Sequence, residues 1–330
     1  MLPEISVVIP TFNRKELLRE LILSLFQQSY PKERYEIIVI DNSSTDGTVQ
    51  LIQEFQQRSP CRLSYYKKEN KGPAASRNLG IKNASGSIIA FTDSDCTVHS
   101  DWLKNAVPYF EENEVAFVSG QKLPKPNQPI SFFSPFQEIT EENPVYPTLN
   151  IFYRRDILNA VGGFDEKFST TKERPEGGED SELAWRIKRQ GWKNVFAKDV
   201  IIYHEVFRYS LFEFLVTEPW RWRQKPFIFK VVPELREKFL FLKIFTSSKR
   251  PFIYMALLGI LFTIFFSNKL FLILTVPYIY TTLRNFGIYN WRNPVHIVKW
   301  FIQLNLLMIR DIIISFINIY GSIRYRTFVL

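Results

Sequence analysis

Cysteine is scarce in this chain, with only Cys61 and Cys96 among 330 residues. Neither thiol lies in a C-x-x-C or Cys/His pattern, so the sequence lacks both a disulfide framework and the spacing of a structural zinc site. The first residues also lack the basic region, apolar stretch and cleavage site of a secretory signal, because the chain runs directly into the apolar segment Ile5 to Ile9. We therefore interpret both thiols as reduced and expect a cytoplasmic N-terminal part.

Acidic residues are almost missing from the C-terminal quarter. Residues 249–330 hold nine Lys or Arg and a single acidic residue, Asp311, so +8 of the formal charge of +9 lies there. A nucleic-acid groove is a poor explanation, because this quarter is also the most apolar part of the chain. The combination favours attraction to an anionic membrane surface.

Long uncharged runs occur only after residue 249. Phe252 to Phe266 and Leu270 to Leu283 are free of charge, and each would span about 20–22 Å as a helix, short of the about 30 Å of a bilayer core. Two buried core helices are one interpretation. We favour a short membrane hairpin over residues 252–283, because it would place four basic residues on one side of the membrane: Lys249, Arg250, Arg284 and Arg292.

Residues 295–320 have a different pattern. Polar residues recur on one helical stripe and most of the remainder is apolar, which is typical of an amphipathic helix lying in the membrane interface. Asn305 and Ser315 fall on the apolar side, so a third helix packed against protein remains an alternative. We predict a catalytic domain over residues 1–248 and a membrane-associated region over residues 249–330.

The N-terminal part alternates short β-branched runs with helical patterns, which predicts an α/β domain with a mostly parallel sheet. In such sheets ligands bind at the carboxyl ends of the strands. Polar residues follow three of the predicted strands at that end: Thr11 to Asn13, Asp41 and Asn42, and Asp93 to Asp95. From Val115 to Pro147 the chain is rich in Pro, Asn and Gln, and we expect an irregular connection over the site.

Asp93 and Asp95, two residues apart after an apolar strand, are the strongest chemical feature. A hard cation that bridges diphosphate oxygens needs carboxylate ligands held at fixed spacing. An isolated D-x-D is more often a solvated turn or helix cap. The strand before it and the surrounding motifs favour a metal site for Mn²⁺ or Mg²⁺.

Four motifs occur in order around that pair: Ser6-Val-Val-Ile-Pro-Thr-Phe-Asn-Arg14, Ile38-Val-Ile-Asp-Asn-Ser-Ser-Thr-Asp-Gly-Thr48, Asn70-Lys-Gly-Pro-Ala-Ala-Ser-Arg-Asn78 and Phe91-Thr-Asp-Ser-Asp95. Together they closely resemble the GT-A domain of family 2 glycosyltransferases, over roughly residues 4 to 205. The resemblance implies a Rossmann-like GT-A fold and transfer of a sugar from a nucleoside diphosphate donor.

The resemblance also implies a nucleotide pocket. Its lining would include Pro10, Thr11, Asn13 and Asp93, with Asp41 or Asn42 on the base or ribose, Gly72 allowing close backbone approach and Arg77 facing the diphosphate or ribose. Asp41 and Arg77 could each have a structural role in place of nucleotide binding. Asp41 could organise a turn or cap a helix, as we expect of Asp46, and Arg77 could form a surface salt bridge. Because Asn42 stands where many relatives have aspartate, this pair does not fix the base; a UDP-sugar is our first candidate.

Two later motifs complete the implied site. Gly178-Glu-Asp-Ser-Glu-Leu-Ala-Trp-Arg186 resembles the acidic motif whose aspartate is the general base of inverting members. We assign that role to Asp180, with Glu179 as the second candidate and capping of the following helix as the structural alternative. Val200-Ile-Ile-Tyr-His204 resembles the strand whose terminal histidine approaches the metal or diphosphate, whereas His99 and His296 have no such context.

The predicted function is inverting sugar transfer to a lipid-linked or cell-surface glycan, in cell envelope polysaccharide biosynthesis. Polyprenyl-phosphate sugar synthesis is the nearest alternative, and a non-catalytic membrane adaptor is the alternative of another class. Processive polysaccharide synthases carry the motif Q-x-x-R-W, whereas in Trp220-Arg-Trp-Arg-Gln224 the glutamine follows the Arg-Trp pair. We therefore reject processive polymerisation and interpret this segment as an aromatic and basic belt at the membrane interface. A sugar nucleotidyltransferase would need a glycine-rich loop after the first strand. We expect a membrane as partner and no nucleic acid.

Overall fold

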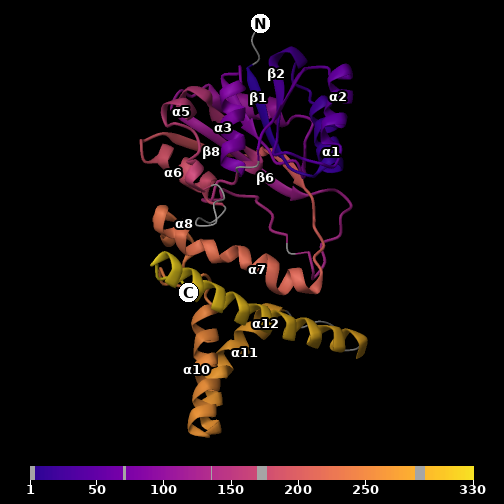
Figure 1. The fold of residues 1–330 in the computed structure, drawn as a ribbon. Helices are drawn as coiled ribbons and strands as arrows, with labels where there is room; N and C mark the ends of the chain where they lie inside the picture. Colours follow the sequence, from indigo (N-terminus) through magenta and orange to yellow (C-terminus); the bar gives the residue numbers. More distant parts are fainter. Residues whose placement is uncertain (1–3, 70–71, 135, 169–176, 287–293) are drawn as a thin grey trace. The chain divides into compact units, whose positions relative to one another are not determined.

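The computed structural model describes residues 4–69, 72–134, 136–168, 177–286 and 294–330. The chain divides into two compact units. Unit 1 comprises Met1–Ile130 and Phe136–Phe207, and unit 2 comprises Ser131–Pro135 and Arg208–Leu330. The predicted boundary between the catalytic domain and the membrane-associated region, after residue 248, stays a prediction. Figure 1 shows the elements of both units.

Unit 1 is built on an eight-stranded sheet, counted over the described residues, with the order β3-β2-β1-β4-β7-β6-β8-β5. The strands β1 to β4 are parallel neighbours, β7 runs antiparallel between β4 and β6, and β5 runs antiparallel to β8. The mostly parallel α/β sheet predicted from the sequence is confirmed. The bounds are β1 Ile5–Thr11, β2 Tyr35–Asp41, β3 Arg62–Lys67, β4 Ile88–Phe91, β5 Cys96–Val98, β6 Val115–Pro124, β7 Ile151–Arg154 and β8 Lys193–His204.

Alternating side chains of the central strands enter two cores, one on each face of the sheet. Val7 and Ile9 of β1 join the core under α1 (Lys15–Phe26), α2 (Thr48–Arg58) and α4 (Trp102–Ala106). Val8 joins the core under α3 (Pro73–Asn83), α5 (Arg155–Ala160) and α6 (Glu179–Lys188). Period-2 alternation with apolar residues on both faces is what a sheet covered on both sides requires. Short 3₁₀ segments connect the elements: η1 Lys32–Arg34, η2 Val107–Phe110, η3 Thr148–Asn150 and η4 Glu166–Phe168.

The expectation of an irregular connection from Val115 is wrong for its first ten residues. These form β6, which pairs with β7 and in parallel with β8. Its start, Val115 to Val118, is fully buried. The strand continues past the apolar run into polar residues, because β7 and β8 on either side provide hydrogen-bond partners for its backbone.

In unit 2, two helical segments fold back on each other as a hairpin. α10 (Arg250–Phe266) is followed by η7 (Lys269–Thr275) and α11 (Val276–Phe286), and a β-carbon on Gly259 would lie 2.6 Å from the Phe271 carbonyl oxygen. The turn uses Ser267 in the left-handed region and the Asn268 side chain, which accepts a hydrogen bond from the Leu270 N–H. These segments cover the residues 252–283 for which a membrane hairpin was predicted, and their insertion in a membrane stays a prediction.

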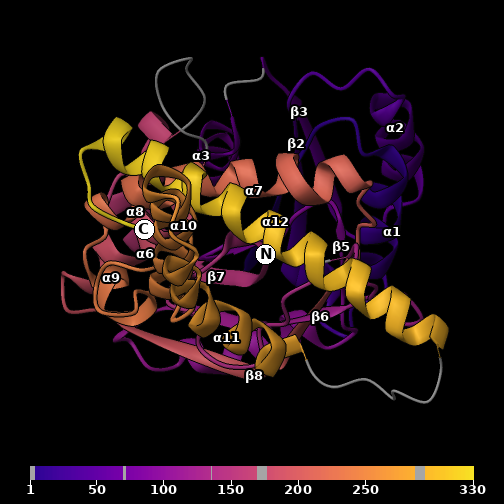
Figure 2. The same cartoon turned by 90° about the horizontal axis from the view of Figure 1, so that it is seen from below.

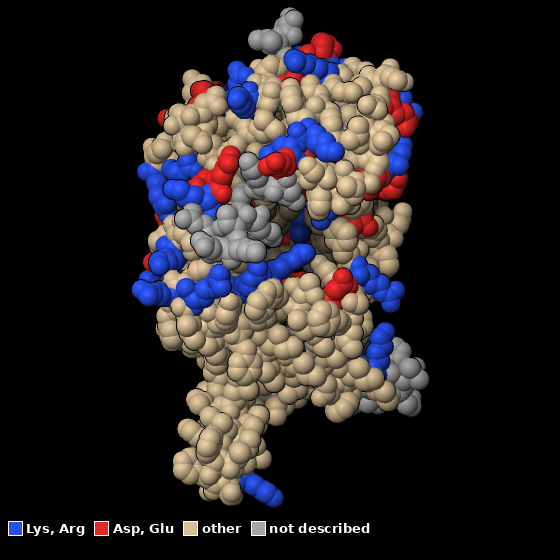
Figure 3. All heavy atoms as spheres, viewed as in Figure 1, with Lys and Arg blue, Asp and Glu red and all other residues tan. Residues whose placement is uncertain are grey.

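The end of this hairpin exposes large apolar side chains. Ile264, Phe265, Phe266, Leu270 and Ile273 are all 65–74% exposed. Figure 3 shows wide uncharged surface in unit 2. An apolar patch of this kind in a monomer marks an interaction surface.

The long helix α12 (Pro294–Tyr325) packs beside the helical run η5 Glu213–Thr217, α7 Glu218–Trp220, η6 Arg221–Gln224 and α8 Lys225–Val231, with α9 Glu234–Phe239 following. Figure 2 shows α7 and α12 side by side. The rings of Trp220 and Tyr320 stack with centroids 5.6 Å apart. Ser315 is fully buried, so the C-terminal half of α12 packs against protein, while Phe301 in the other half is 61% exposed. Among the described residues, Val298–Tyr325 is the one helix long and apolar enough to cross a membrane. Arg292 and the side chain of His296 lie outside the described residues.

Candidate active site

The loops after β1 and β2 are bound to each other through Asn13. Its backbone is in the left-handed region at φ +51°, its N–H donates to Ser44 Oγ over 2.8 Å, and its Oδ1 accepts from the Thr45 N–H at 2.8 Å. Asn42 N–H donates to the Thr11 carbonyl at 2.9 Å. Pro10 precedes them in β1, opposite Ile40 of β2. The two loops that carry the predicted nucleotide residues are therefore hydrogen-bonded to each other.

Asp41 and Asn42 use their side chains within the protein. Asp41 is fully buried, and its carboxylate accepts from Ser44 Oγ at 2.6 Å and from the Tyr65 hydroxyl at 2.6 Å. These are the contacts of the turn interpretation. Asn42 Oδ1 accepts from Ser76 Oγ at 2.7 Å, which links the β2 loop to α3. Burial opposes ionisation of Asp46, but its carboxylate accepts from the Thr48 hydroxyl and from the N–H groups of Lys15 and Thr48, and these hydrogen bonds lower its pKa.

Helix α3 begins at Pro73, directly after Gly72, whose φ of +86° favours glycine, and Arg77 lies in its second turn. Arg77 is 5% exposed, so the surface salt bridge considered for it is wrong. Its Nη1 donates to Glu179 Oε1 at 2.9 Å and its Nη2 to Asp93 Oδ1 at 3.2 Å. One buried guanidinium thus joins the D-x-D motif to the later acidic motif.

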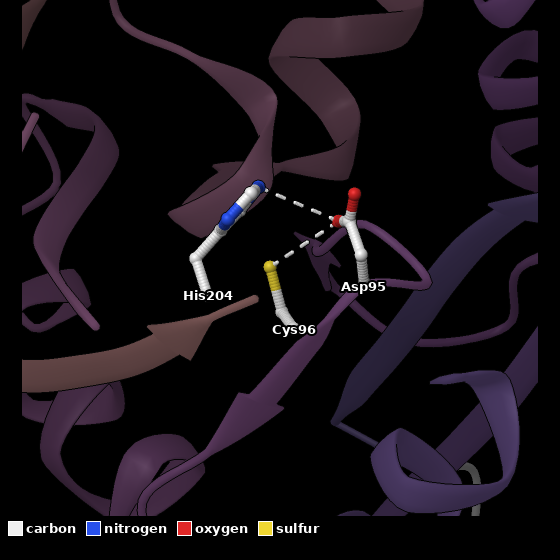
Figure 4. A group of neighbouring side chains, drawn as sticks. All are labelled: Asp95, Cys96 and His204. Atoms are coloured by element: carbon white, nitrogen blue, oxygen red, sulfur yellow. Dashed lines mark hydrogen bonds and ion pairs between the residues drawn. The ribbon is translucent and has the colours of Figure 1, made fainter. Parts of the chain in front are cut away.

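Asp95 lies beside His204 because β5 pairs with β8 in a register that sets Cys96 opposite His204. Asp95 Oδ1 is 3.6 Å from His204 Nε2 and 3.9 Å from Cys96 Sγ, and ligand atoms of the three residues all lie within 4.8 Å of one another (Figure 4). His204 Nδ1 lies 2.7 Å from the Glu205 carbonyl oxygen, which only accepts. Nδ1 therefore carries a proton, and Nε2 is the ring nitrogen that faces Asp95.

The donor set fits a divalent cation. Carboxylate oxygen and neutral imidazole are ligands that Mn²⁺ accepts. Burial raises the pKa of the Cys96 thiol, with Asp95 and Asp93 adding to the effect, so the neighbouring sulfur is a neutral thiol here. Asp93 lies outside this group of three, and its carboxylate faces Arg77.

Asp180 stands in the first turn of α6, after Gly178 at φ +99°. Burial, then the neighbouring Glu179, raises the pKa of Asp180 to about 7, against the opposing effect of Arg77. Its Oδ1 accepts from the Ser181 N–H at 2.8 Å. Glu179, in contrast, is 5% exposed and paired with Arg77. Asp180 is the better placed of the two to exchange a proton.

Sequence reasoning missed two residues of this site. Cys96 was interpreted only as a reduced thiol, although it directly follows Asp95. Arg14 was quoted only as the end of a motif, yet its Nη1 lies 2.6 Å from Asp95 Oδ2. The one signal for it in the sequence is its place directly after Asn13, at the end of the first of the four motifs. His99 has a structural role, since its Nδ1 accepts from the Asp101 N–H at 3.2 Å.

Two family models match the chain. "Glycosyl transferase family 2" matches residues 6–164, and "Glycosyl transferase family group 2" matches residues 88–313. Among curated proteins, glycosyltransferase AglE of Haloferax volcanii is 32% identical over 211 residues, which cover 62% of this chain and 67% of AglE. Poly(ribitol-phosphate) β-N-acetylglucosaminyltransferase TarS of Staphylococcus aureus is 33% identical over 108 residues, which cover 33% of this chain and 19% of TarS.

Solved structures share the fold. The mannosyltransferase PcManGT from Pyrobaculum calidifontis, in complex with GDP-Man and Mn²⁺, matches with a TM-score of 0.59 and 19% identity over 99% of this chain and 88% of that one. Residues 1–349 of S. aureus TarS, in complex with UDP-GlcNAc, match with a TM-score of 0.50 and 18% identity over 98% of this chain and 89% of that one. At these identities the likeness establishes the GT-A fold. Since one family model spans well over half of the chain and AglE is matched over two thirds of its length, this chain belongs to glycosyltransferase family 2.

Proposed function

We propose that this protein is a metal-dependent, inverting glycosyltransferase that moves a sugar from a nucleoside diphosphate donor to a hydroxyl of a lipid-linked or cell-surface glycan. The observation that carries the proposal is the Arg77 bridge, which ties Asp93 of the D-x-D motif to Glu179, the neighbour of Asp180. It brings the candidate base to the motif expected to hold the donor.

The donor side of the proposal rests on the loops after β1, β2 and β4. Asp95 and His204 would hold Mn²⁺ or Mg²⁺, and Asp93 would add a second carboxylate. The cation would supply charge neutralisation for the leaving diphosphate. Two structures with this fold hold GDP-Man and UDP-GlcNAc. Both bases therefore belong in the test, with a UDP-sugar as the first candidate.

Asp180 would take the proton of the acceptor hydroxyl as the new glycosidic bond forms. A pKa of about 7 suits a general base at neutral pH. Attack by the hydroxyl on the face opposite the diphosphate inverts the anomeric carbon. A phosphate acceptor carries no proton that must be removed, so a base at this position favours a hydroxyl acceptor over polyprenyl phosphate.

Membrane association would come from the exposed apolar hairpin and from α12. The proposed membrane region is residues 249–330, with the catalytic domain of residues 1–248 on the cytoplasmic side. Four apolar side chains around the hairpin turn are 67–74% exposed and would enter lipid: Ile264, Phe265, Phe266 and Leu270. A lipid-linked acceptor would then be held close to the site.

The test is a panel of UDP- and GDP-sugars incubated with the purified full chain in Mn²⁺, Mg²⁺ or EDTA. We expect one donor to bind and hydrolyse slowly, with metal required. Asp95→Ala should lose metal-dependent binding, because one carboxylate ligand is removed. Failure of every donor to bind in any metal would favour the adaptor alternative, and full activity in EDTA would overturn the metal assignment.

A further inference from the structure

Arg14 forms an ion pair with the carboxylate that the proposed metal site depends on. Its Nη1 is 2.6 Å from Asp95 Oδ2, and the two residues are 81 positions apart in the chain. The side chain of Asp95 is 7% exposed, while that of Arg14 is 44% exposed. A buried carboxylate is therefore neutralised by a guanidinium that has room to move.

The two oxygens of Asp95 face different partners. Oδ1 points toward His204 and Cys96, and Oδ2 is taken by Arg14 (Figure 4 shows the first of these arrangements). A cation at Oδ1 and His204 would lie next to a guanidinium that already shares the same carboxylate. The cation and the Arg14 guanidinium would repel each other. The ion pair with Arg14 also reduces the negative charge that the Asp95 carboxylate can offer to the cation.

Few contacts besides the ion pair with Asp95 hold the Arg14 side chain in this position. Among the described residues, Asp95 is the one hydrogen-bond partner of the Arg14 side chain. The guanidinium also lies 5.9 Å from the ring centroid of Phe207, whose ring is 6.2 Å from that of His204. A second cation, Lys122, lies close enough to Asp95 to interact with it electrostatically, and its ammonium is 4.5 Å from the centroid of Phe136. Asp95 thus has two cationic side chains near it that can act as counter-ions.

A diphosphate changes this balance. Its oxygens accept paired hydrogen bonds from a guanidinium fork, and Arg14 directly follows the loop residue Asn13 that joins the two predicted nucleotide loops. Movement of the guanidinium from Asp95 to the diphosphate would free Oδ2 and restore the full charge of the carboxylate. The anion would also offset the repulsion between Arg14 and the cation.

We propose that Arg14 is an exchangeable counter-ion of Asp95, which weakens metal binding in the absence of nucleotide and strengthens it once a diphosphate is bound. The inference rests on the proposed metal and donor site. Because binding coupling is reciprocal, Arg14 also makes nucleotide affinity depend on the metal.

The test measures Mn²⁺ affinity of the full chain by electron paramagnetic resonance, with and without saturating UDP, in the wild type and in Arg14→Ala. Arg14→Ala should bind Mn²⁺ alone about 5-fold or more tightly, and the gain in Mn²⁺ affinity that UDP gives should shrink by a similar factor. Arg14→Lys keeps the charge and should retain most of the coupling. Arg19→Ala is the matched control, because Arg19 pairs with Glu16 at 3.2 Å on the exposed face of α1 and should change neither affinity.

Weaker binding of Mn²⁺ alone by Arg14→Ala would overturn the inference and make Arg14 an orienting partner of the ligand. Mn²⁺ affinities of Arg14→Ala that equal those of the wild type, both with and without UDP, would overturn it as well. Both outcomes leave the proposed function intact, provided the wild type binds Mn²⁺ with UDP and Asp95→Ala does not. Absence of Mn²⁺ binding in the wild type, with UDP or GDP, would instead refute the proposed metal site itself.

Discussion

Asp180, the base in the proposed reaction, is costly to the fold when it is ionised. Its pKa is raised to about 7, first by burial and then by Glu179, although the Arg77 guanidinium lowers it. A base with that pKa is half-ionised near neutrality and binds a proton much more strongly than an ordinary aspartate. The two predictions at this scale follow from that single property.

Asp180→Asn should spare donor binding and reduce sugar transfer by about 10²–10⁴, the usual worth of a positioned general base. In the wild type, kcat/KM should rise with pH through about 7, because only the carboxylate accepts the proton. Transfer assays from pH 5.5 to 8.5, beside UDP binding, check both statements. An equal loss of donor affinity in the variant would place Asp180 in the nucleotide site instead.

Asp180→Asn should also stabilise the metal-free protein at pH 8. Below the pKa of Asp180 in the unfolded chain, the folded and unfolded states both hold the proton, and ionisation of Asp180 does not change the free energy of unfolding. As the pH rises toward about 7, the carboxyl ionises in the unfolded state but stays protonated in the folded state, which destabilises the fold. The penalty is complete above about pH 7, so the neutral amide should gain up to about 4 kcal/mol there and progressively less toward pH 4. Urea unfolding in EDTA at both pH values measures this. A gain that is the same at pH 4 and pH 8 would contradict it.

Helix α3 is the element on which the geometry of the site depends most. It presents Ser76 to Asn42 and Arg77 to Asp93 and Glu179. It reaches them because it packs very close to β1: a β-carbon added to Gly80 would lie 2.2 Å from Val8 Cγ1. The helix cannot accept a larger residue there without moving away from the sheet.

Gly80→Ala should therefore destabilise the protein by about 1–3 kcal/mol and weaken UDP binding, even though alanine favours helix. Val8→Ala in the same chain should restore part of both losses by making room. Lys82→Ala, an exposed position on α3, is the control and should leave both unchanged. Chemical denaturation and UDP titration of the wild type, Gly80→Ala, Val8→Ala and the double variant form a double-mutant cycle. Additive losses in that cycle would show that the contact with Val8 is not the cause.

At the scale of the whole molecule, the compact units divide after Phe207, well before the apolar region begins. Unit 1 contains both sheet cores and every candidate site residue. In unit 2, α12 covers the run from Glu213 to Val231, with Gly321 so close that a β-carbon would lie 2.4 Å from the Arg223 carbonyl oxygen. Removal of α12 alone would leave that run without its partner.

Truncation after Phe207 should yield a chain that binds UDP with Mn²⁺ and stays in solution, while truncation after Ser248 should aggregate because the face covered by α12 is exposed. Light scattering, UDP titration and vesicle flotation of both chains and the full protein distinguish these outcomes, and only the full protein should float. Phe132 and Phe133, which pack on Phe214, are best replaced by serine in the shorter chain. A soluble, monomeric chain of residues 1–248 would contradict the prediction.

The sequence by itself determined the mostly parallel sheet, the D-x-D motif after a buried strand and the family, because each depends on short apolar runs and polar residues a few positions apart. It also determined the hairpin, whose two apolar runs flank a three-residue polar turn. The tertiary structure alone decided that Asp41 organises a turn, that Arg77 is a buried bridge and that Arg14 pairs with Asp95. It also turned Val115 to Pro124 into a strand. These outcomes depend on strand register and on packing between residues far apart in the chain, as with Arg14 and Asp95 at a separation of 81 positions. No local pattern encodes that separation, because loop closure and the burial of distant side chains are settled together when the sheet assembles.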